Sequence, residues 1–433
     1  MATGLGDTSR LDAASTPSII PDVVEQHAEE AAFLWCLRDA ATDEPHYALR
    51  HLAALEERIE AHIDGLRVAG EAGLAIAWAQ LDQYGGPGEL FVVATLSLES
   101  RDPISLERAL QFAESAPVSR RGLFGALGWV SRDALRGQAV AWLDDTSSFR
   151  RLAGVVACSL HRADLSSRMQ QLLADEPSVR ARALRLVGEL GSLDVREQVR
   201  VSLNDDDAAC RFWAAWSAGL LGDRTSAIPV LQDYAAGGSV FKWRALDLVV
   251  RLMDHDSAIA WLRELGRDPR HARLVVIAGG ILGDPVVVPW LIQKMSVPTL
   301  ARVAGDSFSL ITGVDLSRHG LDGDVPAEFT TGPTDDTADE NVAVDADENL
   351  PWPDPGKLQA WWGMHGKRFA HGVRHLCGSP LTLQICHEVL RGGYQRQRRA
   401  ATYELAIANP SGPLWNWRAR AHAQAASSRP STE

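Results

Sequence analysis

A repeat of 30 or 31 residues runs through the middle of the chain and constrains its fold more than any other feature. The frame begins at a row of mostly basic residues: Arg120, Arg150, Arg180, Arg211, Lys242, Ala272 and Arg302. Three residues further on, each repeat has a small or aliphatic residue: Leu123, Ala153, Ala183, Ala214, Ala245, Val275 and Gly305. A fixed period in this range predicts stacked helix pairs, because one pair alone cannot bury its apolar face. The sequence therefore predicts an all-α fold, an α-solenoid.

Glycines recur at a second position of the repeat. Gly191, Gly222, Gly283 and Gly313 each lie eleven residues after the start of the frame. Glycine readily adopts the left-handed backbone conformation that ends many helices. We therefore expect these glycines to end the first helix of each repeat, and a second helix to follow.

The basic row of the frame has two interpretations. Successive guanidinium groups along a solenoid could bind phosphate. However, an acidic residue precedes several of the arginines by five positions, as in Asp145 and Arg150 or Asp175 and Arg180. Pairing between arginines and acidic residues inside the array explains the row without a ligand, and we favour this interpretation.

Changes in composition divide the chain into six predicted parts. They are a disordered N-terminus (1–21), an N-terminal helical cap (22–85), the repeat array (89–315), an acidic irregular insertion (316–355), a C-terminal helical region that caps the array (356–422) and a disordered tail (423–433). The boundary between the N-terminal cap and the array coincides with the glycine- and proline-rich residues 85–88, which are typical of a break between helices.

The charge is distributed unevenly along the chain. The formal net charge is −13, but 11 acidic residues lie between Asp322 and Asp354, so the remainder is nearly neutral. Such a balance does not favour nucleic acid as a partner. Acidic residues at 345–354 could hold a cation, but the spacing lacks the features of an EF-hand loop. We favour a solvated acidic segment, or one that packs on the basic region beginning at Lys357.

Cysteine content and hydropathy indicate a cytoplasmic protein. The five cysteines are unpaired in spacing, and Cys158 and Cys210 lie in apolar helical contexts, so reduced core thiols are expected. No apolar stretch reaches the roughly 18 residues that a membrane span requires. The first residues also lack the pattern of a secretory signal.

Aromatic and basic residues provide the candidates for partner binding. The chain has 14 tryptophans, and tryptophan and arginine are enriched at protein interfaces. The candidates are Trp213, Trp216, Trp352, Trp361, Trp362, Arg396, Arg398 and Arg399. Tryptophan also wedges stacked helices apart, so a core position is the competing interpretation for Trp213 and Trp216. A polar outer face on a capping repeat is the competing interpretation for the arginines.

Motifs of catalysis and of cofactor binding are not found. The sequence has no phosphate-binding P-loop, no nucleophile elbow, no zinc-binding HExxH and no dinucleotide fingerprint. We therefore assign no catalytic, cofactor-binding or metal-binding residue from the sequence. Catalytic groups that assemble across repeats would escape this search, so an enzyme stays open as an alternative.

Several segments resemble a particular bacterial family. They include His62-Ile-Asp-Gly-Leu-Arg, Gly188-Glu-Leu-Gly, Cys210-Arg-Phe-Trp-Ala-Ala-Trp, Phe308-Ser-Leu-Ile-Thr-Gly-Val-Asp, Leu350-Pro-Trp-Pro-Asp-Pro and Gln395-Arg-Gln-Arg-Arg. Together they resemble the HEAT-like repeat proteins of proteobacteria that carry type VI secretion systems. The resemblance spans about residues 22–422 and implies HEAT-like helix pairs. That family has no established activity, and the resemblance implies only a setting, as a cytoplasmic accessory of a contractile secretion apparatus.

These observations give one leading hypothesis and two alternatives. The leading hypothesis is a non-enzymatic scaffold that binds a protein, such as a type VI secretion component or effector. The first alternative is a HEAT-like repeat enzyme, resembling bilin lyases or solenoid DNA glycosylases. In the second, the acidic insertion covers the inner surface of the array until a partner displaces it.

Overall fold

The computed structural model describes residues 19–329, 332 and 345–427. The predicted disordered N-terminus, up to residue 18, therefore lies outside the described residues, as do residues 428–433 of the predicted tail. Within the part that is described, no helix is both long enough and apolar enough to cross a membrane.

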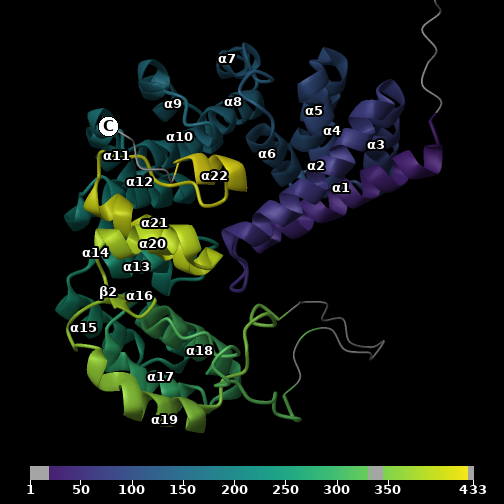
Figure 1. The fold of residues 1–433 in the computed structure, drawn as a ribbon. Helices are drawn as coiled ribbons and strands as arrows, with labels where there is room; N and C mark the ends of the chain where they lie inside the picture. Colours follow the sequence, from purple (N-terminus) through teal and green to yellow (C-terminus); the bar gives the residue numbers. More distant parts are fainter. Residues whose placement is uncertain (1–18, 330–331, 333–344, 428–433) are drawn as a thin grey trace, which may run out of the picture. The chain divides into compact units, whose positions relative to one another are not determined.

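The chain divides into two compact units, which we call unit 1 and unit 2 (Figure 1). Unit 1 combines the segment ending at Cys36 with Glu57–Ala126. Unit 2 combines Leu37–Glu56 with the chain from Leu127 onward. Both units are helical, and the repeats of the sequence frame fall mostly in unit 2.

Unit 1 is organised around one helix that is buried on almost every side. Its helices are α1 (Pro21–Ala41), α2 (Leu49–Ala69), α3 (Glu71–Tyr84), α4 (Pro87–Ser100), α5 (Pro103–Ser115) and α6 (Arg120–Trp129), of which α1, α2 and α6 also have residues in unit 2. The sequence of α4 is apolar all round, which is typical of a core helix. Phe91 of α4 stacks on Trp35 with ring centroids 4.8 Å apart. The glycine-rich residues 85–88 separate α3 from α4 within this unit, where Gly85 ends α3 at φ 66°.

Unit 2 contains the stacked helix pairs, which confirms the predicted all-α solenoid. The first helices are α8 (Ser148–Leu160), α10 (Pro177–Leu190), α12 (Ala208–Leu220), α14 (Lys242–Leu252), α16 (Ala272–Leu282) and α18 (Pro298–Thr312). Each packs on the next member of this row. The second helices are α7 (Gln138–Leu143), α9 (Met169–Leu173), α11 (Arg196–Val201), α13 (Arg224–Ala236), α15 (His255–Leu265) and α17 (Val288–Lys294).

Short elements complete the connections of unit 2. Six turns of 3₁₀ helix are η1 (Ser166–Arg168), η2 (Leu193–Val195), η3 (Ser202–Asn204), η4 (Pro269–His271), η5 (Pro285–Val287) and η6 (Gly366–Arg368) within the described residues. Two short strands, β1 (His375–Leu376) and β2 (Ser379–Pro380), pair antiparallel.

The predicted row of small residues lies where neighbouring first helices meet. Ala153, Ala183, Ala214 and Ala245 are all fully buried. Because alanine occupies little volume, consecutive helices approach closely at this position, and larger aliphatic residues fill the space on either side. This small-residue position is therefore a packing feature of the repeat.

The recurrent glycines adopt the predicted left-handed conformation. The φ angles of Gly191, Gly222, Gly283 and Gly313 lie between 70° and 92°. Some of them also make room for a distant part of the chain. A Cβ at Gly313 would lie 2.4 Å from the Cys377 carbonyl oxygen, and one at Gly191 would lie 2.7 Å from that of Gly412. These glycines thus end helices and admit the C-terminal segment at the helix ends.

A Gly313→Ala substitution tests this double role. We expect it to lower the free energy of unfolding by about 2–3 kcal/mol, because a strained backbone conformation combines with overlap against Cys377. Gly320 is the matched control, since its φ is 63° but a Cβ there would meet nothing within 4 Å. Gly320→Ala should cost only about 1 kcal/mol. Equal losses in urea unfolding would show that the approach of Cys377 does not matter.

The basic row of the frame is paired inside the array, which confirms the favoured interpretation. Arg150 contacts Asp145 at 3.2 Å, and Arg180 contacts Asp205 of the next repeat at 2.7 Å. Arg211 donates hydrogen bonds to the backbone carbonyls of Asp205 and Asp206. The row therefore links the turns of consecutive repeats.

The described part of the insertion packs on the last repeats. Leu316, Leu321 and Leu350 are buried with residues of α18. Asp345 forms an ion pair with Arg302, and Asp347 forms one with Arg273 at 2.6 Å. These two acidic residues are thus paired with the array, whereas Lys357, where the basic region begins, donates to the Asp322 carbonyl of the insertion at 2.8 Å. Residues 330–331 and 333–344 of the predicted insertion lie outside the described residues.

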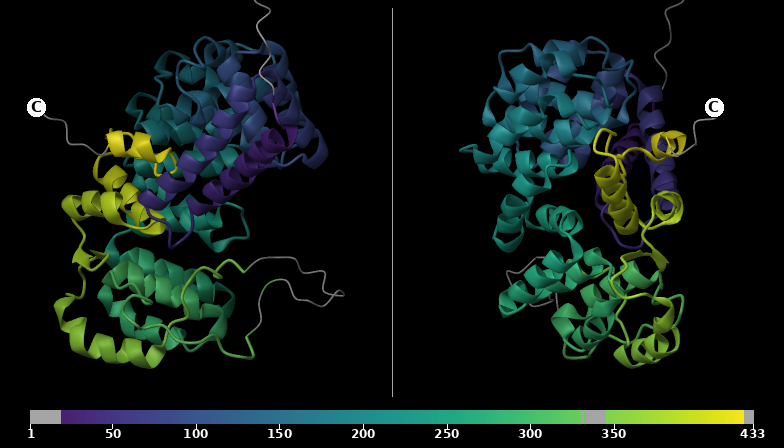
Figure 2. Two further views of the ribbon diagram at one scale, coloured as in Figure 1. Left: turned by 45° about the vertical axis from the view of Figure 1, so that its right-hand side comes forward. Right: turned by 90° about the vertical axis from the view of Figure 1, so that its left-hand side faces the viewer.

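The C-terminal region returns along the array. Helix α19 (Pro355–His365) packs on α17 of the last pair, as expected of a capping element. Helices α20 (Leu383–Gly392) and α21 (Gln395–Ala408) pack together, and α21 lies against α12 and α14 in the middle of the array (Figures 1 and 2).

The last helix, α22 (Ala421–Ser427), lies within the segment that composition predicts to be a disordered tail from residue 423. The side chain of Gln424 accounts for the difference, because its amide donates to the carbonyl of Trp417 at 3.0 Å and accepts a hydrogen bond from Arg398 at 2.6 Å.

Candidate functional site

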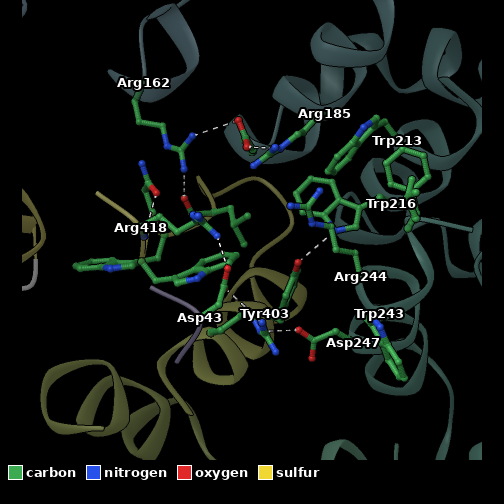
Figure 3. A pocket seen from close by; sticks show the side chains of 18 residues that line it. Asp43, Arg162, Arg185, Trp213, Trp216, Trp243, Arg244, Asp247, Tyr403 and Arg418 are labelled. Carbon is green, nitrogen blue, oxygen red and sulfur yellow. Dashed lines mark hydrogen bonds and ion pairs between the residues drawn. The ribbon is translucent and has the colours of Figure 1, made fainter. Parts of the chain in front are cut away.

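A pocket of about 410 Å³ lies in unit 2 where the C-terminal segment crosses the middle of the array (Figure 3). Helices α10, α12 and α14 supply one wall, and α21 with residues 414–418 supplies the other. Asp43 completes the lining from the connection between α1 and α2. A volume of this size is typical of sites that take a small molecule or a few side chains.

The array wall is built from two equivalent positions of the repeat. Two residues after the start of the frame, consecutive repeats have Arg182, Trp213 and Arg244. Five residues after it, they have Arg185, Trp216 and Asp247. Because repeats stack in register, these side chains come to one face of adjacent first helices. The flanking repeats have apolar or small residues at both positions, namely Leu152, Val155, Leu274 and Ile277.

Aromatic rings form the floor of this wall. Trp213 and Trp216 meet edge to face with ring centroids 5.3 Å apart, and both are buried. Phe212 lies behind them and stacks on Phe241 at 4.2 Å. Across the pocket, the Trp216 indole N–H donates to the Tyr403 hydroxyl at 3.4 Å. The aromatic cluster therefore connects α12 to α21.

The upper side of the pocket is organised by the buried carboxylate of Glu189. It accepts hydrogen bonds from Arg185 at 2.7 Å and from the Ser159 hydroxyl at 2.5 Å, and it pairs with Arg182 and Arg162. Burial alone would raise the pKa of this carboxyl group, but the three guanidinium groups outweigh burial and hold the pKa below its usual range. Burial lowers the pKa of Arg182 to about 10. Glu189 is thus an anion that holds three cations in place.

On the lower side, ion pairs join the array to the C-terminal helices. Arg399 of α21 contacts Asp247 of α14 at 3.0 Å and Asp43 at 3.7 Å. Arg418 contacts Asp43 at 2.6 Å. Asp43, Asp247 and Arg418 are labelled in Figure 3, and the three ion pairs fix the two walls to each other at this level.

The rim of the pocket is open and apolar. Val240 is 90% exposed and Trp243 is 47% exposed, although both follow α13 in a well-packed part of the array. Arg244, the next residue, directs its guanidinium over the Trp213 ring at 5.7 Å. Arg185 lies over the same ring at 4.8 Å. Burial, followed by repulsion from Arg185, lowers the pKa of Arg244.

The structure brings three of the predicted partner-binding residues together at this pocket. Trp213, Trp216 and Arg399 all line it. Both tryptophans are also buried in the array. They therefore belong to the core and line the pocket at the same time.

The other predicted residues lie elsewhere. Trp361 and Trp362 are half-buried beside Phe308 at 5.6 and 6.5 Å. Trp352 lies beside Phe329 at 4.9 Å. Arg396 pairs with Asp306 at 3.0 Å.

Arg398 is a correction to the sequence-based expectation. It is completely buried and donates to the Leu390 carbonyl at 2.7 Å, as well as to the side chains of Gln395 and Gln424. A side chain in that position joins α20, α21 and α22 and does not reach a partner. The basic run of α21 suggested a solvated face, but Arg396 and Arg399 are half-buried and Arg398 is buried.

Sequence reasoning missed most of the pocket. The missed residues are Arg162, Arg185, Glu189, Trp243, Arg244, Asp247, Tyr403, Trp415, Trp417 and Arg418. A signal for the array wall was present, because three consecutive repeats replace apolar residues by charged or aromatic ones at the same positions. No periodic signal marks the wall made by α21 and residues 414–418.

The chemistry of the lining favours binding. The residues that line the pocket in the described structure are mainly arginine, tryptophan and paired carboxylates, with no serine, cysteine, lysine or histidine among them. In the same part of the chain, no group of three or more His, Cys, Asp or Glu is placed to hold a metal ion. The arrangement offers cationic and aromatic contacts to a ligand.

Comparison with known proteins identifies the repeat. The family profile described as HEAT repeats matches residues 165–246. This region contains α10 and α12 and ends within α14, so it includes Arg185, Trp213, Trp216 and Arg244 of the pocket. No curated protein and no solved structure matches the chain. Residues 165–246 are thus similar to HEAT repeats.

Proposed function

We propose that this HEAT-like repeat protein is a non-enzymatic scaffold that binds a protein partner at the pocket of unit 2. HEAT repeats commonly serve as protein-interaction scaffolds, which supports a protein as the partner. The observation that carries the proposal is the open, apolar rim at Val240 and Trp243 beside the exposed Arg244, which has no ion pair among the described residues. Pockets that combine tryptophan and arginine are typical centres of protein interfaces.

We further propose that the partner is a type VI secretion component or effector, met in the cytoplasm. This finer proposal rests on the resemblance of the sequence segments alone. We also propose the division of the chain predicted from its sequence. Its parts are a cap (22–85), an array (89–315), an insertion (316–355) and a C-terminal region (356–422).

The experiment is affinity purification of the full chain, followed by mass spectrometry, from cells that are producing the secretion apparatus. Trp243→Ala should reduce recovery of the partner by about tenfold or more, because a central interface tryptophan contributes on the order of 2 kcal/mol. Val201→Ala is the control, since Val201 is 75% exposed on α11 and does not line the pocket. A partner recovered equally with both variants would place the interface elsewhere, and recovery of no protein would overturn the scaffold proposal.

A further inference from the structure

The carboxylates of the pocket are already satisfied. Glu189 pairs with Arg162 and Arg185, Asp247 pairs with Arg399, and Asp43 pairs with Arg418. The lining includes five arginines and three carboxylates, so these pairs leave an excess of positive charge. Arg244 is exposed, so part of this excess lies where an anionic ligand can reach it.

The excess is concentrated at Arg244. Among the described residues, no carboxylate or hydrogen-bond acceptor contacts its guanidinium, which lies only over the Trp213 ring. Arg185 lies over the same ring and pairs through a single Glu189 oxygen. Two guanidinium groups therefore contact one aromatic ring while only one of them has an anion. A ligand that brings a negative charge to Arg244 would remove this imbalance.

The surrounding wall favours a ligand with an aromatic or apolar body. Trp243 presents its ring at the rim, and Val240 lies beside it. On the opposite wall, the indole N–H groups of Trp415 and Trp417 are buried and have no acceptor in the described part of the chain. Indole N–H groups normally find an acceptor when buried, so these two are unsatisfied donors within the wall of the pocket.

We infer that the pocket binds an acidic peptide segment of the protein partner, with a carboxylate at Arg244 and Arg185 and a neighbouring aromatic side chain against Trp243. This inference rests on the proposed scaffold function and names the chemistry of its ligand. Planar guanidinium groups bind carboxylates through two parallel hydrogen bonds, which suits an acidic side chain at Arg244. Nucleic acid suits the site less well, because a run of phosphates needs a row of unpaired cations, and four of the five arginines of the lining are already paired.

The test uses the full chain and two dye-labelled peptides, blocked at both ends, of sequence Gly-Glu-Trp-Glu-Gly and Gly-Gln-Trp-Gln-Gly. Fluorescence anisotropy should show binding of the acidic peptide, and binding of the glutamine peptide should be at least about tenfold weaker, since one charge-assisted contact is worth this much. Arg244→Gln should weaken the acidic peptide by a similar factor. Arg267→Gln is the matched control, because Arg267 is exposed at the end of α15, outside the pocket, and pairs with Glu264.

The outcomes separate this inference from the proposed function. Equal binding of the two peptides, or full binding to Arg244→Gln, would overturn the acidic-peptide assignment. Displacement of the acidic peptide by millimolar inorganic phosphate would also overturn it, because the site would then take free anions. If mass spectrometry still identified a partner whose recovery is unchanged by Arg244→Gln, the scaffold would stand without this ligand chemistry. If the acidic peptide bound but no partner protein was recovered, the ligand chemistry would stand and the scaffold proposal would be overturned.

Discussion

Replacing Arg398 with alanine is expected to lower the free energy of unfolding by about 3–5 kcal/mol. The side chain is completely buried and supplies hydrogen bonds to Leu390, Gln395 and Gln424, which belong to three different helices. Its removal leaves a cavity and three acceptors without a donor. Each unsatisfied buried acceptor costs about 1–3 kcal/mol.

The loss should extend from stability to the pocket. Gln395 and Gln424 both donate to the carbonyl of Trp417, at 3.2 and 3.0 Å, so Arg398 orients the amides that hold one wall of the site. Urea unfolding measures the loss of stability. At urea concentrations too low to unfold Arg398→Ala, this variant should also recover less of the partner than the natural protein does.

Two variants control this prediction. Arg398→Met retains most of the volume but none of the donors, so the difference between it and the alanine variant measures the cavity. Arg396→Ala lies on the same helix, where Arg396 is half-exposed and pairs with Asp306, and it should cost no more than about 1 kcal/mol. A loss for Arg398→Ala as small as that for Arg396→Ala would contradict the buried network.

The local features of the array were predictable from the sequence because they repeat. The row of small residues that includes Ala183 and Ala214 lies at the contact between consecutive first helices, and this contact forms whatever the curvature of the solenoid. The left-handed glycines and the paired arginines follow from helix ends and nearby acidic turns in the same way. Each of these features is decided within one repeat or between adjacent repeats.

The pocket was less predictable because half of it comes from outside the repeat. The sequence gives no indication that α21 packs on α12 and α14 and not at the end of the array. The run from Gln395 to Arg399 is basic along the chain, yet burial separates Arg398 from its neighbours. Whether an arginine of this run is buried or accessible depends on which helix packs against α21. That choice is made by contacts between segments far apart in the sequence.

Replacing Glu189 with glutamine is expected to lower the free energy of unfolding by about 3–5 kcal/mol near neutral pH. The carboxylate is buried and faces Arg162, Arg182 and Arg185. Glutamine has nearly the same shape, but it leaves three guanidinium groups without their counter-charge and presents an N–H₂ group toward donors. The loss is therefore electrostatic and not a result of packing.

The pH dependence gives this prediction its sharpest test. The folded structure holds the pKa of Glu189 below its unfolded value of about 4.3, so the carboxylate stabilises the fold fully above that value and progressively less as the pH falls below it. The difference in unfolding free energy between the natural protein and Glu189→Gln should thus be largest at pH 7 and shrink toward pH 3. Glu197→Gln, at an exposed residue of α11 paired only with Arg200, should show almost no difference at either pH. A gap that stays constant with pH would mean that Glu189 acts by hydrogen bonding alone, and the excess of charge around the pocket would lose its electrostatic basis.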